Sequence, residues 1–334
     1  MADDLYTIKY LLEKNRNTFV SGETLAEELG VSRAAVWKQI ERLREAGFNV
    51  ASRPRLGYRL DTARDKLFAA GIDYWLDRYD GFTKPPLTVL ERCESTNITA
   101  KERLADHTGG DFPTFVIAEE QIAGRGRRGR NFYSPPTAGI YLSMAFRPDL
   151  RMEQGQRVTC AAAVQIMRAL TDVTGREPAI KWVNDLYYNE RKISGILTEA
   201  VTDFENGKVT GIVVGVGVNV FFDRDKAPAA LRDIAGGLFT ADERADASSR
   251  NRIAAAMIYR LASLAADHGE ARFRDDILPA YRANMFLIGR EITIEKPDGS
   301  IPATVRDIDA EGRLVCSVDG ETVALSSGEI SLRF

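Results

Sequence analysis

The hydrophobic pattern of the first part of the chain predicts three short helices. Apolar side chains recur every three or four positions over residues 5–14, 21–29 and 32–46, so each segment would bury one helical face. Ser21 and Ser32 stand where the second and third helices begin, and serine at that position caps the free amides of a first turn. Two helices joined by so short a connection predict a helix-turn-helix unit.

Two short extended pieces follow this unit, over residues 48–52 and 57–60. A proline-containing turn at 53–56 separates them, so the two pieces predict a β-hairpin. Three helices and a hairpin make up a winged helix-turn-helix domain. We assign that domain to residues 1–62.

Strand-like and helical periods alternate through the long central region. We expect a linker at 63–82 and then one α/β domain at 83–284, which is within the usual size range of a domain. The expected strands are 87–91, 114–119, 140–146, 179–183, 192–200 and 209–220. The expected helices are 153–174, 252–266 and 273–281.

The last part of the chain changes character and predicts a small all-β domain at 285–334. Short apolar runs alternate there with turns built from glycine and polar residues. The expected strands are 291–296, 301–309, 313–318, 321–326 and 329–334. Strands this short and closely spaced favour an SH3-like barrel. The predicted fold class is therefore α+β and multidomain.

Composition is typical of a globular protein with two or three domains. The 334 residues are 44% hydrophobic and 28% charged. The chain has no apolar run of the roughly 20 residues needed to span a bilayer, and its start lacks the pattern of a secretory signal. We therefore expect a cytoplasmic protein that has no membrane partner.

The cysteines and histidines exclude several kinds of chemistry. Cys93, Cys160 and Cys316 are far apart and form no paired motif, which is typical of a reduced protein without disulfides. The two histidines, His107 and His268, have no neighbours at metal-ligand spacing. We therefore expect no structural zinc site, no Ser-His-Asp triad and no metal held by the protein itself.

Charge is distributed unevenly, although the net charge is only −3. Residues 31–60 hold seven Arg or Lys against two Glu, which gives a local excess of +5. A basic patch on a helix-turn-helix is typical of DNA binding. The candidate DNA-contacting residues on the third helix and the wing are Ser32, Arg33, Lys38, Arg42, Arg53 and Arg55.

A segment rich in glycine and arginine, GRGRRGR at 124–130, follows one of the expected strands. It formally matches the dinucleotide-binding pattern G-x-G-x-x-G, but that pattern requires a helix next, and Pro135 and Pro136 follow instead. Four arginines without an acid, on glycines that allow close backbone approach, favour a loop that binds phosphate or carboxylate. The alternatives are a solvated basic loop and an RNA-binding segment.

Three further segments combine polar residues with strand or cap positions. Lys181 and Lys192 flank an expected hairpin in which Gly195 would allow close approach of a ligand. The alternative is an exposed hairpin whose lysines are solvated. Residues 93–97 (CESTN) end a strand and begin a helix, where they act first as a cap and can also present amides to a ligand. Residues 215–219 (GVGVN) predict a strand whose asparagine needs partners.

Together these segments resemble the biotin protein ligase family, and in particular its bifunctional biotin-operon repressors, over nearly the whole chain. The resemblance rests on ESTN at 94–97, QIAGRGRRGR at 121–130, KWVND at 181–185, KISGIL at 192–197, GVGVN at 215–219 and GEISL at 328–332. The arginine loop and the lysine hairpin are its most specific parts. The family implies a catalytic core related to lipoate-attaching enzymes and a small C-terminal barrel.

The resemblance also implies roles for particular residues. The catalytic residues would be Lys192, Arg125 and Arg127. The residues in contact with biotin or its adenylate would be Ser95, Thr96, Asn97, Gln121, Arg125, Gly126, Arg127 and Lys192. The residues on the ATP side would be Lys181, Asn184 and Asn219. The chain departs from the family at Val183, where proline is usual, and at Phe132, where tryptophan is common. The loop that covers adenine is placed only within 222–240.

The implied activity is the ATP-dependent conversion of biotin to biotinyl-5′-AMP and transfer of biotin to a lysine of a biotin carboxyl carrier protein, a subunit of acetyl-CoA carboxylase. Biotin and ATP are then substrates, with Mg2+ held mainly by the phosphates. The resemblance to biotin-operon repressors implies that the protein is a homodimer whose head binds operator DNA and represses biotin genes. The alternatives are a regulator that only senses a small molecule, a lipoate or octanoate ligase on the same core, and a ligase with a vestigial head.

Overall fold

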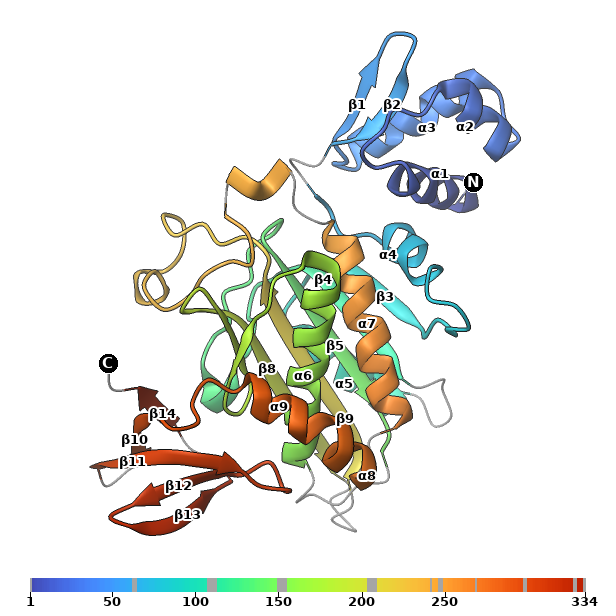
Figure 1. Cartoon of the computed structure of the whole chain (residues 1–334). Helices are drawn as coiled ribbons and strands as arrows, with labels where there is room; N and C mark the ends of the chain where they lie inside the picture. The colour runs from blue at the N-terminus through green and yellow to red at the C-terminus, as the bar shows by residue number, and fades with distance from the viewer. Residues whose placement is uncertain are drawn as a thin grey trace.

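The computed structural model describes residues 2–61, 65–106, 113–148, 155–202, 209–240, 242–245, 249–267, 269–296, 299–326 and 329–332. A head, a central body built on a large sheet, and a small C-terminal sheet follow one another along the chain (Figure 1). The predicted domain boundary at 62–63 falls outside the described residues, as do His107 and His268. No helix within the described ranges is both long and apolar enough to cross a membrane.

The head has the predicted three helices and hairpin. Its elements are α1 (Ala2–Lys14), α2 (Gly22–Leu29), α3 (Arg33–Glu45), β1 (Val50–Arg53) and β2 (Gly57–Leu60). The Ser21 hydroxyl accepts a hydrogen bond from the Thr24 amide at 2.9 Å, and the Ser32 hydroxyl accepts one from the Ala35 amide at 3.2 Å, which confirms both predicted N-caps. The apolar faces of the helices meet in one buried cluster.

The central body is organised by a sheet of seven described strands in the order β3-β4-β5-β9-β8-β7-β6. Its members are β3 (Leu87–Cys93), β4 (Thr114–Gln121), β5 (Gly139–Phe146), β6 (Ala179–Lys181), β7 (Asp185–Tyr188), β8 (Arg191–Thr202) and β9 (Val209–Asn219). The pair β3 and β4 is parallel, and the other neighbouring pairs are antiparallel. All six expected strand segments are found in this sheet, and β7 fills the interval between two of them.

Helices cover the two faces of this sheet unequally. On one face α5 (Thr96–Asp106) packs against β4, β5 and β9. On the other face α6 (Gly155–Thr174) and α7 (Arg250–Ala266) bury the main apolar core (Figure 1). The chain continues through α8 (Glu270–Arg272), a π-helical turn (Phe273–Ile277) and α9 (Leu278–Asn284). Because α5 covers only part of its face, the strands beyond it can form the floor of a pocket.

The segment 63–82, predicted as a linker, contains a helix, α4 (Ala69–Leu76). Ile72 and Leu76 are buried in the core of the body, whereas Phe68 and Ala70 are buried in the head cluster. The helix therefore has apolar side chains on two sides and packs against both α1 and α7. The segment predicted as a linker therefore includes a helix, and its buried side chains belong to both the head cluster and the body core.

The C-terminal strands form one antiparallel sheet in the order β13-β12-β11-β10-β14. They are β10 (Glu291–Lys296), β11 (Gly299–Ile308), β12 (Leu314–Val318), β13 (Glu321–Leu325) and β14 (Glu329–Leu332). This sheet confirms the predicted all-β character, while closure into a barrel stays a prediction. The turn before β12 contacts the body, where the Gly312 carbonyl accepts a hydrogen bond from the Trp182 indole at 2.9 Å.

Candidate functional site

A pocket of about 470 Å³ is lined by the start of α5, the loop after β4, the β6–β8 hairpin, β9 and the segment that follows β9. Every residue expected to contact biotin or ATP lines it. These residues are Ser95, Thr96, Asn97, Gln121, Arg125, Gly126, Arg127, Lys181, Asn184, Lys192 and Asn219. The fold therefore brings the separate sequence motifs together around one cavity, although the individual roles of these residues remain predictions.

One corner of the pocket is a hydrogen-bond network at the start of α5. The Gln121 side-chain oxygen accepts from the Thr96 amide at 2.8 Å and from the Thr96 hydroxyl at 3.1 Å. The Ser143 hydroxyl lies 2.7 Å from the Thr96 hydroxyl and 2.6 Å from the Asn97 side-chain oxygen. The Gln121 side-chain nitrogen donates to the Ser134 hydroxyl at 3.0 Å. The two serines were not predicted, because a single serine in a strand or loop carries no signal in the sequence.

Asn97 is held by a second set of contacts. Its side chain is almost fully buried, and its nitrogen donates to the Glu199 carboxylate at 2.7 Å. Lys101, one turn further along α5, donates to the other Glu199 oxygen at 2.6 Å. Asn97 also lies directly over Gly215, where an added β-carbon would be 2.0 Å from the asparagine oxygen. The glycine is therefore required for the position of Asn97.

We expect Gly215→Ala to weaken biotin binding about tenfold, because overpacking a filled site costs ~1–3 kcal/mol and the Asn97 side chain would have to move. Titration calorimetry with biotin measures the effect. Gly155→Ala is the matched control, because a β-carbon there meets nothing within 4 Å. Equal biotin affinity of the two variants would contradict the role assigned to Asn97.

Two more glycines make room for Phe132 on the pocket floor. Gly195 and Gly217 are paired across β8 and β9. A β-carbon at Gly217 would lie 2.3 Å from the Phe132 ring, and one at Gly195 would lie 3.4 Å from both that ring and the Lys192 ammonium nitrogen. The aromatic ring also meets Tyr141 edge-on, with the ring centroids 6.4 Å apart. Gly195 thus accommodates Phe132 and Lys192, which the sequence pattern alone did not indicate.

The arginine loop is a tight turn between β4 and Phe132. The Gly126 amide donates to the Arg130 carbonyl at 2.7 Å, and the Phe132 amide donates to the Gly124 carbonyl at 2.8 Å. The tip, Arg127–Gly129, is one 3-10 turn in which two consecutive residues have positive φ. The chain leaves this turn without entering an α-helix. This geometry agrees with the rejection of a dinucleotide-binding fold.

The two arginines predicted to act on the ligand differ in their surroundings. Arg127 is half-buried, and its guanidinium donates to the Asn184 side-chain oxygen at 3.2 Å. Arg125 is about half exposed, and its guanidinium lies 3.8 Å from the Glu94 carboxylate. Arg127 therefore connects the arginine loop to the hairpin across the pocket, whereas Arg125 stays at the rim.

The hairpin places a partly buried acid beside the predicted catalytic lysine. The Lys192 ammonium nitrogen lies 2.7 Å from a carboxylate oxygen of Asp185, and both side chains are partly buried. The Lys181 ammonium nitrogen lies 5.6 Å from the centroid of the Tyr187 ring. Burial and the negative charge of Asp185 raise the pKa of Tyr187 to about 12, so this phenol is protonated at neutral pH. Asp185 was missed as a site residue, although it belongs to the KWVND motif.

The segment 222–240 forms the remaining wall. The Lys192 amide donates to the Ile234 carbonyl at 2.9 Å, and the Lys192 carbonyl accepts from the Gly236 amide at 2.9 Å. The Asn219 side chain donates to the Gly236 carbonyl at 3.1 Å. Apolar pocket residues from this segment are Phe222, Leu231, Ile234 and Ala235. They were not predicted individually, because an irregular segment has no hydrophobic period.

The pocket is suited to positioning and charge stabilisation. Cys93 ends β3, and burial together with the charge of Glu94 raises the pKa of its thiol to about 11, which disfavours a thiolate nucleophile. All three cysteines are free. Among the described residues, no group of three or more His, Cys, Asp or Glu side chains could hold a metal ion. The arrangement can instead bind anions through lysine and arginine and hold two reactants together.

The predicted DNA-contacting side chains are exposed on α3, on its N-cap and on the hairpin of the head. They are Ser32, Arg33, Lys38, Arg42, Arg53 and Arg55. The Arg53 guanidinium lies 5.1 Å from the centroid of the Phe19 ring. Trp37 is 54% exposed on the same face of α3 as Arg33, one turn away. It was not predicted, because an apolar ring at helical spacing is expected in a core.

Comparisons with known proteins agree with this three-part architecture. The model of the biotin/lipoate A/B protein ligase family matches residues 89–219. A model of an HTH domain matches residues 5–59. A model of the biotin protein ligase C-terminal domain matches residues 287–333.

Individual proteins are similar to the chain over most or all of its length. The bifunctional ligase/repressor BirA of Escherichia coli is 34% identical over 337 residues, which cover 100% of this chain and 99% of the relative. The biotin–[acetyl-CoA-carboxylase] ligase of Mycobacterium tuberculosis is 32% identical and covers 84% of this chain and 98% of the relative. The structure of the Aquifex aeolicus biotin protein ligase in complex with biotin and ATP is 25% identical, with a TM-score of 0.60, over 74% of this chain and 98% of that chain.

Proposed function

Because the chain belongs to the biotin protein ligase family and matches one of its bifunctional ligase/repressors from end to end, we propose that the pocket carries out biotin activation and transfer and that the head carries out repression. The protein ligates biotin at the expense of ATP. It also acts as a repressor through its helix-turn-helix domain. The acceptor is a lysine of a biotin carboxyl carrier protein that serves acetyl-CoA carboxylase, as the name of a relative suggests.

The reaction proceeds in two steps. A carboxylate oxygen of biotin attacks the α-phosphorus of ATP, the bond to the bridging oxygen breaks, and pyrophosphate leaves, so that biotinyl-5′-AMP forms. The uncharged amine of the acceptor lysine then attacks the acyl carbon. An amide forms, the bond to the phosphate oxygen breaks, AMP leaves and the amine gives up a proton. Neither step requires an enzyme nucleophile, which suits a pocket whose neighbouring thiol is protonated.

Cationic side chains carry the electrostatic part of the catalysis. The Lys192 ammonium holds the biotin carboxylate and then the oxygen that bridges the acyl and phosphoryl groups. Arg125 and Arg127 hold the α-phosphate, with the Gly126 amide close to the ligand. These roles are supported by the common location of the residues around one pocket. Cations fixed in a partly dry site stabilise developing negative charge more strongly than they would in water.

The remaining polar residues orient the two substrates. Ser95, Thr96, Asn97 and Gln121 contact the polar part of biotin at the corner where their side chains are already hydrogen-bonded. Lys181, Asn184 and Asn219 face ATP, with residues 222–240 covering the adenine. Mg2+ enters with ATP and is held mainly by its phosphates, since Mg2+ sites commonly combine few protein carboxylates with phosphate oxygens and water.

The observation that carries this proposal is one pocket that contains both the lysine hairpin and the arginine loop. The test is labelling of a purified biotin carboxyl carrier domain with biotin and ATP, together with measurement of AMP and pyrophosphate release. We expect labelling that requires ATP and the acceptor lysine. Lipoate and octanoate supplied in place of biotin are the controls. Binding of biotin without ATP turnover, or preferential transfer of lipoate or octanoate, would contradict the proposal.

The same proposal extends to the head and to the C-terminal strands. The head binds operator DNA upstream of biotin genes, and the chain acts there as a homodimer, because two winged helices normally read two half-sites. The C-terminal strands close as an SH3-like barrel, which is supported by their short lengths and antiparallel pairing. A cytoplasmic location goes with three free cysteines.

We expect biotinyl-AMP to strengthen operator binding by roughly 5- to 150-fold, the usual range of coupling between two sites on one protein. The adenylate can do so only if it binds the dimer more tightly than the monomer. Sedimentation and operator binding, each measured at one salt concentration with and without adenylate, test this link. Equal dimerisation and equal DNA affinity in both conditions would mean that the ligase site does not control the repressor.

A further inference from the structure

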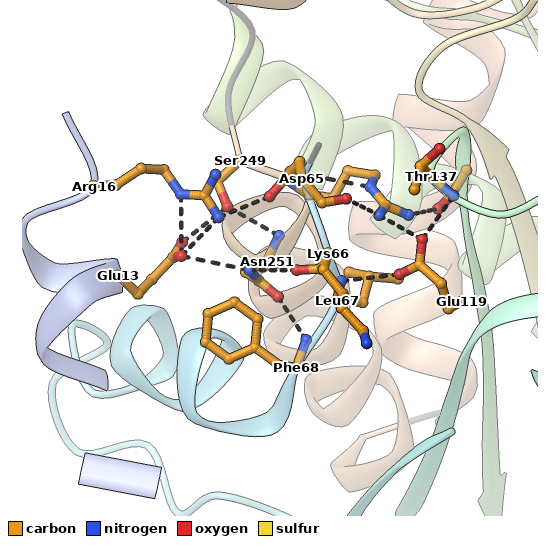
Figure 2. Close-up of polar contacts among 12 residues, drawn as sticks. Glu13, Arg16, Asp65, Lys66, Leu67, Phe68, Glu119, Thr137, Ser249 and Asn251 are labelled. Carbon is orange, nitrogen blue, oxygen red and sulfur yellow. Dashed lines mark hydrogen bonds and ion pairs between the residues drawn. The ribbon is translucent and has the colours of Figure 1, made fainter. Parts of the chain in front are cut away.

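A cluster of buried charges lies where the head meets the body (Figure 2), and none of its members is among the residues that line the pocket. Its members are Glu13 and Arg16 of the head, Asp65 before α4, Glu119 on β4 and Arg250 at the start of α7. Each of them is at most 9% exposed. Three carboxylates surround two guanidinium groups, so the cluster carries a net charge of −1. Neither the proposed chemistry nor the proposed DNA contacts use these residues.

The head supplies one end of this charge cluster. Arg16 donates two hydrogen bonds to one Glu13 oxygen, at 3.0 and 2.7 Å, and one to Asp65 at 2.7 Å. The other Glu13 oxygen accepts from the Trp75 indole of α4 at 2.8 Å and from the Ser249 hydroxyl at 2.8 Å. Every acceptor oxygen of Glu13 is therefore bound, and its partners on α4 and beside α7 reach it only when the head is docked.

The body supplies the other end. The Arg250 amide donates to Asp65 at 2.5 Å, and its guanidinium donates to the Asp65 carbonyl and to Glu119 at 2.7 Å. The opposite oxygen of Glu119 accepts from the Leu67 amide at 2.9 Å. Asp65 is thus the shared member, because Arg16 binds one of its carboxylate oxygens and the Arg250 amide binds the other. The ion pairs form one continuous chain from α1 to the large sheet.

The body end of the charge cluster also holds the segment that contains the arginine loop. The Glu119 oxygen that binds Arg250 also accepts a hydrogen bond from the Thr137 amide at 2.7 Å (Figure 2). The Arg250 guanidinium donates to the Gly139 carbonyl at 2.8 Å. Both contacts fall where the segment 122–138, which contains the arginine loop, rejoins the sheet. The same strand leads from Glu119 to Gln121 of the pocket, so both ends of this segment are anchored near the cluster.

Buried charges of this kind specify geometry more than they add stability. Two or more ions removed from water regain their solvation energy only when every partner is in place, and removal of one partner leaves an uncompensated charge. Burial lowers the pKa of Arg16, but the charges of Asp65 and Glu13 outweigh it and raise the pKa overall, so this side chain stays charged. An undocked head would therefore leave Asp65 without one of its two cationic partners.

We propose that Arg250 and Glu119 are positioning residues that hold the base of segment 122–138, and that Arg16 and Glu13 make this hold depend on docking of the head. The inference rests on the proposed function, because it concerns retention of biotinyl-AMP by the arginine loop. A head locked in this way fixes the orientation of α3 relative to the pocket. A substitution at either end of the charge cluster then alters the contacts at the other end.

The test is a double-mutant cycle between Arg16→Met in the head and Glu119→Gln in the body, read out as the dissociation rate of preformed biotinyl-AMP from the full-length protein. We expect each single substitution to speed dissociation about tenfold, an effect within the range measured for coupled networks. The double variant should also lose adenylate about tenfold faster, whereas independent sites would give about a hundredfold. The single-turnover rate of adenylate formation at saturating biotin and ATP should change much less, because no reacting group is altered.

Two controls separate positioning from general damage. Lys14→Met removes a cation at the end of α1, two positions before Arg16, but Lys14 pairs only loosely with Glu28, at 3.8 Å, so adenylate dissociation should match the wild type. Arg16→Lys restores a charge and should recover part of the retention. It also serves as the head variant if Arg16→Met does not fold, as judged by its thermal unfolding.

The outcomes distinguish this inference from the function on which it rests. A wild-type protein that forms no biotinyl-AMP overturns the proposed function. A wild type that retains the adenylate, with Arg16 variants that release it at the wild-type rate, overturns only the inference. Additive effects on the dissociation rate in the double variant would also overturn it, since the head and segment 122–138 would then act independently.

Discussion

Lys192→Ala should slow the formation of biotinyl-AMP by roughly a hundredfold to several thousandfold. A buried charge left without its partner costs about 3–5 kcal/mol, and each 1.36 kcal/mol is a factor of ten in rate. The biotin carboxylate would lose its cation both on binding and as negative charge shifts toward the phosphate. The loss should therefore appear in kcat as well as in the KM for biotin.

The ion pair between Lys192 and Asp185 sharpens this prediction. In the structure the ammonium contacts Asp185 at 2.7 Å, so a ligand carboxylate must share or displace that partner. Asp185→Asn keeps the lysine and removes only its anchor, and it should cost far less than the loss of Lys192. Lys181→Ala should mainly raise the KM for ATP. Pyrophosphate release from biotin and ATP measures all three variants, and an unchanged rate for Lys192→Ala would rule out the assignment.

The parts of the fold that were predicted correctly depend on local chemistry. Ser21 and Ser32 cap helices through amides only three positions away. The rejection of a dinucleotide-binding fold depended only on the prolines that follow the arginine loop. Interactions over so few residues depend on the neighbouring sequence, and therefore the sequence alone is enough to predict them.

The parts that were missed depend on partners far away in the chain. The helix at Ala69–Leu76 has apolar residues on two sides because the head and the body both pack on it. In the sequence alone that pattern does not show a single buried face. Likewise, Asn251 accepts from the Phe68 amide at 3.1 Å across 183 positions, and no local signal reveals such a pair.

The candidate site shows the same division. The family resemblance supplied the cationic and polar residues, and the structure places them around one pocket. It did not supply Ser143, Glu199 or Asp185, because their importance comes from contacts with Thr96, Asn97 and Lys192. Residues that act by orienting other residues are identified only when the fold is known.

Arg127→Gly should release biotinyl-AMP roughly tenfold to a hundredfold faster than the wild type, because a charge-assisted hydrogen bond contributes about 1.5–3 kcal/mol. Arg127 is half-buried and its guanidinium reaches Asn184 at 3.2 Å, so it links the arginine loop to the opposite wall. Glycine removes that link and also the contact with the phosphate that we propose for this arginine. Adenylate formation should slow less than release accelerates, because Lys192 is unchanged.

Escaped biotinyl-AMP should acylate lysines on unrelated proteins, since the mixed anhydride reacts with any accessible amine. The measurement is biotin transfer to a bystander protein mixed with the carrier domain, with the adenylate release rate recorded in parallel. Arg128→Gly is the matched control, because it deletes the same charge from an exposed side chain whose φ of 57° suits glycine. If Arg127→Gly labelled only the carrier, or if both variants released biotinyl-AMP equally fast, retention of the adenylate would not depend on the contact across the pocket. A specific leak from Arg127→Gly would show that this one arginine keeps the activated biotin from water and from the wrong amines.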